Sequence, residues 1–133
     1  MRAIIVEDSP ECLELYEAFL LSVFQDIIVE KESNGLDGIN KIMENKYNFI
    51  WTDLNMPYMG GIGLIENIRS YSSVNKDTFI FVASGDEDLL GKLRSKSFTN
   101  MIILEKPVTI QEFRKVVSEK LQLPPHIKVN LES

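Results

Sequence analysis

Acidic, hydroxyl and cationic side chains follow four short apolar runs of this 133-residue chain. Glu7 and Asp8 follow the run IIV, and Asp53 follows NFIWT. Ser84 follows FIFVA, and Lys106 follows MIILE. Such runs are typical of buried parallel strands, and the carboxyl ends of those strands line the crevice where an open sheet binds ligands. Three acids, a hydroxyl and a lysine at that edge predict a site for Mg²⁺ and a phosphoryl group.

The three acids fit a magnesium site because Mg²⁺ takes oxygen ligands, usually one or two carboxylates with water and substrate phosphate. We expect Asp8 and Asp53 to bind the ion directly and Glu7 to act through water. Without a cation, two carboxylates ~4 Å apart repel each other by about 4 kcal/mol at an effective dielectric constant near 20. Lys106 compensates for only one of these charges, so the imbalance itself favours a metal.

An aspartate in such a setting can act as a nucleophile and form an acyl phosphate. Mg²⁺, the Lys106 ammonium group and the Ser84 hydroxyl would then each contact one phosphoryl oxygen. The segment Leu54-Asn55-Met56-Pro57 after Asp53 has a backbone carbonyl to offer to the metal. Gly60-Gly61 allows this loop to turn before the next helix.

Strand and helix patterns alternate five times along the chain. The apolar runs predict strands at residues 2–7, 26–32, 48–53, 78–84 and 100–104. Helix-start signals follow each run, at Ser9-Pro10, Asn34-Gly35, Gly60-Gly61, Asp86 and Thr109. This alternation with short connections predicts an α/β fold with a doubly wound parallel sheet. Pro124-Pro125 ends the last helix, so we expect one domain at residues 1–123 and a tail or linker at 124–133.

Composition and charge restrict the class of protein. The net charge is −6, which argues against a nucleic-acid surface because phosphate backbones are bound by clustered Lys and Arg. Cys12 is the single cysteine and has no partner for an internal disulfide, which favours a reducing compartment. No apolar run approaches the ~20 residues that a membrane helix needs. We therefore expect a cytoplasmic domain with no direct nucleic-acid contact and no membrane insertion.

The polar residues and their spacing resemble a response-regulator receiver domain of two-component signal transduction. The matching motifs are Glu7-Asp8, DLNMPYMGG at residues 53–61, Ser84-Gly85 and Lys106-Pro107. The spacing from Asp8 to the acceptor aspartate is 45 residues, with 31 more to the serine and 22 more to the lysine. The resemblance covers residues 2–122. It implies the flavodoxin-like (βα)5 fold, in which five helices surround a parallel sheet of strand order 2-1-3-4-5.

The resemblance also implies the roles of the acids. Asp53 would be the phosphoacceptor, and Glu7, Asp8, Asp53 and the backbone carbonyl of Asn55 would hold Mg²⁺. The phosphoryl donor would be a histidine kinase or a histidine phosphotransfer protein. The chain would therefore be a signalling switch that assists its own phosphorylation and slow dephosphorylation, not an enzyme acting on a separate substrate.

Ser84 and Lys106 would bind the phosphoryl group, and the Lys106-Pro107 peptide would be cis. The residues two positions after the acceptor and after the serine, Asn55 and Asp86, lie where the family tunes hydrolysis of the acyl phosphate. Phosphorylation would bias an equilibrium between inactive and active states. The output would be a downstream protein target or an effector domain outside this chain, and phosphorylation-dependent homodimers are a further possibility.

Two departures from the family pattern leave alternatives open. Ile103 stands where receivers commonly carry Tyr or Phe, so aromatic switching is not expected there. Phe98-Thr99-Asn100 replaces a segment of small residues before the fifth strand. One alternative is a pseudo-receiver, a binding module that is never phosphorylated. Another is a phosphohydrolase of the haloacid dehalogenase type, which is disfavoured because Asn55 stands where its second acid belongs and no cap domain is evident.

Overall fold

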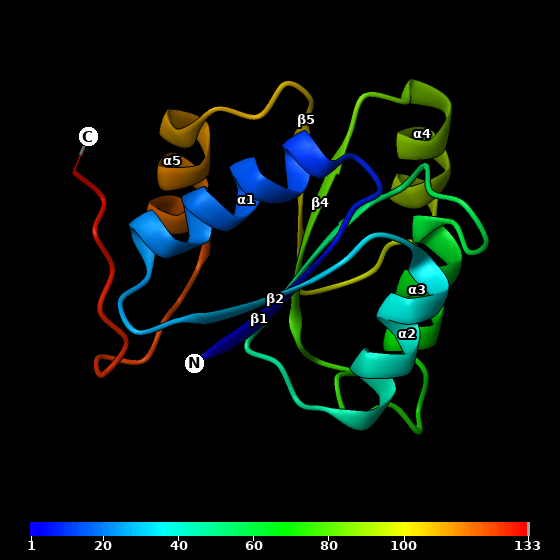
Figure 1. Ribbon diagram of the computed structural model, residues 1–133, viewed down its shortest axis with the longest axis horizontal. Helices are drawn as coiled ribbons and strands as arrows, with labels where there is room; N and C mark the ends of the chain where they lie inside the picture. The colour runs from blue at the N-terminus through cyan, green and yellow to red at the C-terminus, as the bar shows by residue number, and fades with distance from the viewer. Residues whose placement is uncertain (133) are drawn as a thin grey trace.

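A five-stranded parallel sheet forms the centre of the molecule (Figure 1). The structure is a computed structural model and describes residues 1–132. The strands are β1 (Arg2–Val6), β2 (Ile28–Glu32), β3 (Phe49–Asp53), β4 (Phe79–Ser84) and β5 (Met101–Glu105). Their order is β2-β1-β3-β4-β5, and every neighbouring pair is parallel. This order confirms the expected doubly wound fold.

Five helices cover the two faces of the sheet. They are α1 (Pro10–Val23), α2 (Gly35–Glu44), α3 (Gly61–Ile68), α4 (Glu87–Ser95) and α5 (Ile110–Lys120). Figure 1 shows α1 and α5 on one side of the sheet and α2, α3 and α4 on the other. The side chains of the central strands point alternately to these two sides and form two separate buried clusters. Each face of the sheet therefore has its own hydrophobic core.

The predicted helix starts are correct, and the caps explain them. The Ser9 hydroxyl accepts a hydrogen bond from the Cys12 N–H at 3.3 Å, and Pro10 opens α1, where its missing N–H costs nothing. The Thr109 hydroxyl accepts from the Glu112 N–H at 3.1 Å at the start of α5. Each of these caps satisfies a backbone donor that the first turn of a helix leaves free.

Aromatic side chains fill the core beneath α1 and α5. Trp51 is 1% exposed, and its ring stacks on Tyr16 at a centroid distance of 4.4 Å. Phe113 of α5 and Phe81 of β4 lie 5.1 and 5.4 Å from the same indole ring. These ring contacts join α1 and α5 to the central strands β3 and β4.

The predicted strand bounds differ from the observed ones by one residue at β1, β3, β4 and β5, and by two residues at the start of β2. The second strand begins at Ile28 rather than residue 26, because Asp26 adopts a left-handed turn with φ of 59°. This edge strand is also not covered on both faces, since Ile28 is 63% exposed. Phe24 is buried but lies just beyond α1 in extended backbone, and Phe19 is on the buried face of the helix.

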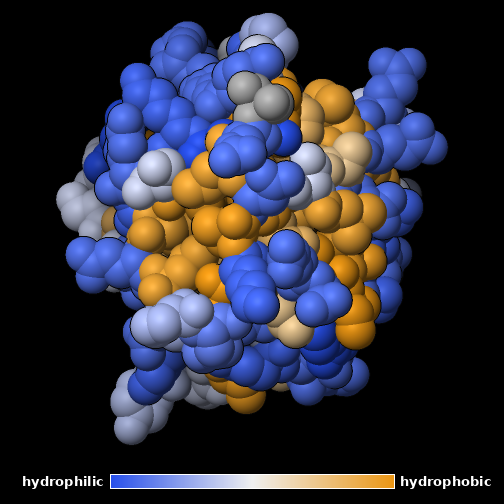
Figure 2. All heavy atoms as spheres, turned by 90° about the vertical axis from the view of Figure 1, so that its left-hand side faces the viewer, coloured by the Kyte–Doolittle hydropathy of each residue, from blue (hydrophilic) through white to orange (hydrophobic). Residues whose placement is uncertain are grey.

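Residues 124–132 pack against the main body of the domain. Val129 forms an antiparallel bridge with Phe24, and the Asn130 N–H donates to the Val23 carbonyl at 2.7 Å. Ile127 and Val129 lie against the core under α1 and α5. Figure 2 shows hydrophobic atoms gathered on this face of the molecule. The segment is therefore held by backbone pairing, while a domain boundary at residue 123 stays a prediction.

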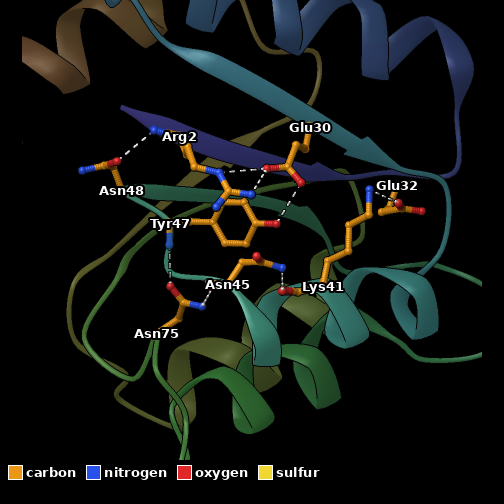
Figure 3. A network of polar contacts seen from close by, with 8 residues as sticks. All are labelled: Arg2, Glu30, Glu32, Lys41, Asn45, Tyr47, Asn48 and Asn75. Carbon is orange, nitrogen blue, oxygen red and sulfur yellow. Dashed lines mark hydrogen bonds and ion pairs between the residues drawn. The ribbon is translucent and has the colours of Figure 1, made fainter.

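A polar network joins the edge of the sheet to α2 and to the loops at the start of β3 and β4 (Figure 3). Arg2 pairs with Glu30 at 2.6 Å, and the Tyr47 hydroxyl donates to the same carboxylate at 3.1 Å. The Arg2 guanidinium lies 5.1 Å from the centre of the Tyr47 ring. The side chain of Asn75 is fully buried and binds the backbone at both ends of the connection between α2 and β3.

The Tyr47 hydroxyl predicts a pH dependence of stability. Burial and the Glu30 carboxylate raise its pKa from 10.0 to about 12. The unfolded chain therefore loses this proton first, and the free energy of unfolding should fall by about 2 kcal/mol between pH 10 and pH 12. Urea unfolding across this range should give a flatter profile for Tyr47→Phe, whereas Tyr71→Phe, at a 94% exposed ring, should keep the wild-type slope. Equal slopes for all three proteins would contradict the prediction.

Within residues 1–132, none of the helices has the length and apolar character needed to cross a membrane.

Candidate functional site

The carboxyl ends of β1 and β3 bring three acids together, as the sequence predicts. Oxygen atoms from Glu7, Asp8 and Asp53 all lie within 4.8 Å of one another. Glu7 and Asp53 are buried and Asp8 is exposed. β1 and β3 are neighbours in the sheet although they are not consecutive in the chain. The acids therefore lie at the topological switch point, where open α/β sheets bind ligands.

Lys106 follows β5 and reaches both buried acids. Its ammonium nitrogen lies 3.2 Å from Glu7 Oε2 and 3.3 Å from Asp53 Oδ2. The Lys106 N–H donates to the Ser84 carbonyl at 3.0 Å, which fixes the start of the side chain beside β4. Burial lowers the pKa of the lysine, but the Asp53 and Glu7 carboxylates outweigh that effect and raise it overall. The lysine is therefore a permanent positive charge between the acids.

One lysine does not balance the negative charge of the site. Burial raises the pKa of the Glu7 carboxyl, and the nearby Asp53 carboxylate raises it further. Lys106 and a hydrogen bond from the Ser9 N–H oppose this rise but do not cancel it. Since a raised carboxyl pKa means that the charged form is disfavoured, the site has room for a further positive charge.

A cleft of about 570 Å³ opens beside Asp53. It is lined by Asp53, Asn55, Ser84, Gly85, Asp86, Glu87, Asp88 and Lys106. The Ser84 oxygen accepts a hydrogen bond from the Asp86 N–H at 3.1 Å, and Asp86 in turn caps α4. The hydroxyl proton of Ser84 is therefore free to donate to a group in the cleft, and the serine is tied directly to the first turn of α4.

The loop after Asp53 fixes the position of the Asp53 carboxylate. The Leu54 N–H donates to Asp53 Oδ1 at 2.7 Å, and Leu54 and Met56 are buried. Asn55 is exposed between these two anchors and lines the cleft. A side chain at Gly61 would overlap the Asp53 carbonyl, so only glycine allows α3 to begin so close to β3.

Glu87 and Asp88 form part of the wall of the cleft, although the sequence motifs do not include them. Their position directly after the cap Asp86, in the first turn of α4, was an available signal. Both residues are exposed, so the mouth of the cleft is more acidic on the α4 side than the motif residues alone predict.

The residues at the departures from the receiver pattern lie together. Ile103 is half-buried and lines a surface pocket of about 190 Å³ with Phe98, Met101 and Leu93. Asn100 has a φ of 54° and so takes the expected left-handed conformation. The Lys106-Pro107 peptide is cis, as the resemblance implies. The unusual residues therefore change the surface between α4 and β5 and leave the acid cluster intact.

Comparison with known proteins identifies the family. The sequence model of the response regulator receiver domain matches residues 3–118. A probable chemotaxis protein CheY of Rhizobium etli is 28% identical over 119 residues, which cover 88% of this chain and 89% of that protein. Transcription factor SKN7 of Candida albicans is 28% identical to this chain. The match covers 98% of this chain but only 22% of that protein. The chain also spans only 56% of the probable response regulator DctR of Bacillus subtilis, at 22% identity and 97% of its own length.

Solved structures have the same fold. The chemotaxis regulator CheY4 of Vibrio cholerae gives a TM-score of 0.75 at 22% identity, with 90% of this chain and 98% of that chain covered. The receiver domain of a sensor histidine kinase from Pseudomonas aeruginosa, with a magnesium ion coordinated in its active site cleft, gives 0.72 at 21% identity over 88% and 93% of the two chains. With the family match, the sheet order and the clustered acids in agreement, this chain belongs to the response regulator receiver domain family.

Proposed function

We propose that Asp53 accepts a phosphoryl group from a phosphohistidine donor in the presence of Mg²⁺. The resulting acyl phosphate would shift the domain between two states that differ in their protein–protein contacts. The observation that carries this proposal is the contact of Lys106 with both Glu7 and Asp53 at the edge of an open cleft.

The donor set suits Mg²⁺. The three acids offer carboxylate oxygens within 4.8 Å of one another, and Mg²⁺ prefers oxygen ligands. The raised pKa of Glu7 supports the same assignment, since a bound cation would favour its charged form. We assign Glu7, Asp8, Asp53 and the Asn55 backbone carbonyl as the groups that hold the ion. When bound, Mg²⁺ would neutralise charge on the transferred phosphoryl oxygens.

The side chains of this site can carry out the transfer. An oxygen of the Asp53 carboxylate forms a bond to phosphorus while the P–N bond of the phosphohistidine breaks. The imidazole leaves with the bonding electron pair and takes a proton from solvent. Lys106 pairs with one phosphoryl oxygen, and the Ser84 hydroxyl donates to another. Both groups already lie on the wall of the cleft beside Asp53.

The hydrogen bond between Ser84 and the start of α4 would carry the structural change caused by phosphorylation to the surface of the domain. Ser84 is hydrogen-bonded to Asp86, the cap of α4, so a movement of the serine toward a phosphoryl oxygen would pull on that cap. Because Ile103 is aliphatic, α4 and its cap would carry the change without an aromatic ring. We propose a histidine kinase or phosphotransfer protein as donor, and a downstream protein or an effector domain outside these residues as recipient of the signal.

The test is the intact mass of the protein after incubation with acetyl phosphate. The expected result is one added phosphoryl group when Mg²⁺ is present and none when Mg²⁺ is replaced by EDTA. Beryllofluoride with Mg²⁺ should also bind at the same site. The amide chemical shifts of Asp53 and Ser84 would report this binding. If neither acetyl phosphate nor beryllofluoride reacts with the protein, the proposal fails and an unphosphorylated binding module is the better interpretation.

A further inference from the structure

Helix α2 lies against the loop that carries the proposed metal ligand Asn55. Gly35 is the first residue of α2 and is buried. A Cβ atom built at Gly35 would overlap the backbone carbonyl oxygen of Met59 and would lie 3.0 Å from Met59 Cβ. Backbone conformation does not explain this glycine, since glycines with positive φ are absent from the described residues. Gly35 is therefore required by the close approach of two backbones.

The β3–α3 loop, residues 54–60, is held near Met59 by its own hydrogen bonds and by packing of the Met59 side chain against the buried cluster that includes Leu54 and Met56. The Met59 N–H donates to the Pro57 carbonyl at 2.8 Å, and the Gly61 N–H donates to the Leu54 carbonyl at 2.9 Å. Tyr58 stands between Pro57 and Met59. It is 87% exposed and has a φ of 69°, which is unusual for a bulky residue. The start of α2 contacts the backbone of this part of the loop directly, at Met59.

The same region of the chain is also fixed to the acids at the end of β1. The Glu7 N–H donates to the Glu32 carbonyl at 3.0 Å, just before α2 begins. One turn after Gly35, a Cβ at Gly38 would lie 2.8 Å from a methyl group of Val6, the residue that precedes Glu7. The start of α2 is therefore held to the acid pair and to the acceptor loop at once.

We infer that Gly35 is a positioning residue for the metal site: by allowing α2 to touch Met59, it sets the distance of the acceptor loop from Glu7 and Asp8. The inference rests on the proposed function, because it concerns the same Mg²⁺ site. A methyl group at this position must move either the loop or the helix, since the atom it meets is backbone. Residues that orient metal ligands from outside typically change metal affinity by about 10- to 100-fold when they are replaced.

The test is a Mg²⁺ titration of folded Gly35→Ala, with amide chemical shifts as the measure of binding. The dissociation constant should rise by about 10-fold or more relative to the wild type. The matched control is another helical glycine that contacts neither the loop nor β1. Gly91→Ala, where nothing lies within 4 Å of the new methyl group, should leave the affinity unchanged.

A measurement on the wild-type protein covers the case in which Gly35→Ala does not fold. Mg²⁺ should slow hydrogen exchange at the Gly38 N–H, which closes the first turn of α2 on Asn34, by more than at the Phe113 N–H in α5. Equal slowing at the two amides, or an unchanged Mg²⁺ affinity in folded Gly35→Ala, would overturn the inference while leaving the proposed function in place. If the wild-type protein binds no Mg²⁺, the proposed function and the inference fall together.

Discussion

Replacement of Asp53 by Asn is expected to remove phosphorylation completely. The amide of Asn is a far weaker nucleophile than a carboxylate, so the rate of phosphoryl gain from acetyl phosphate should fall at least about a thousandfold. Intact mass spectrometry should show the added phosphoryl group on the wild-type protein and only unmodified mass for the variant. The wild-type product should also lose its added mass in hydroxylamine, as an acyl phosphate does.

The matched control is Asp88→Asn, which removes one negative charge from the same cleft without touching the acid cluster. This variant should still gain a phosphoryl group. Mg²⁺ should raise the Tm of the wild type and of Asp88→Asn, because a ligand that binds only the folded state stabilises it, and should raise the Tm of Asp53→Asn much less. Phosphorylation that persists in Asp53→Asn would place the acceptor elsewhere.

The largest loss of stability is expected from Asn75→Ala. The buried side chain accepts hydrogen bonds from the Tyr47 N–H and the Thr78 hydroxyl, both at 2.9 Å. It donates to the carbonyls of Ile42 and Asn45 at 2.6 and 2.7 Å. Alanine would leave several of these groups without a partner, at a cost of about 1–3 kcal/mol for each group that water does not reach.

We therefore expect the free energy of unfolding of Asn75→Ala to fall by about 4 kcal/mol, and the Tm by about 15 °C. Thermal unfolding followed by Trp51 fluorescence would measure both. Asn40→Ala, at an exposed position of α2, should change the Tm by no more than a degree or two. A Tm for Asn75→Ala close to that of the wild type would mean that water replaces the lost amide, and the network would then be less important than its geometry indicates.

Much of the candidate site could be predicted because its residues follow strands whose apolar runs are unambiguous. Glu7 directly follows β1, while Asp53 and Ser84 are the last residues of β3 and β4, and a parallel sheet brings such positions to one edge. The order of the strands could be predicted only from the resemblance to a family. Apolar runs of Ile, Val and Phe indicate where strands lie but not which strands are neighbours.

Features that depend on distant contacts could not be predicted from local patterns. Asn75 lies in a polar segment that is typical of a loop, and only the fold brings Ile42 and Tyr47 to its side chain. The pairing of residues 127–130 with the turn after α1 is similar, since the sequence before this segment gives no sign of it. The prolines also misplaced the end of the last helix, because α5 ends at Lys120 and the backbone is already extended at Leu121. Gly35 gave a helix-start signal, but its contact with Met59 becomes visible only once α2 and the acceptor loop are placed together.

The position of Lys106 has a consequence for how the chain folds as it is synthesised. The lysine is 99 residues from Glu7 and 53 residues from Asp53 along the sequence, and it follows the strand at the far edge of the sheet. A nascent chain that has released only its first three strands already carries the acids at adjacent strand ends, but not the cation that lies between them. Mutual repulsion of the acids would therefore disfavour close approach of the carboxyl ends of β1 and β3 until β5 emerges from the ribosome or a metal ion binds.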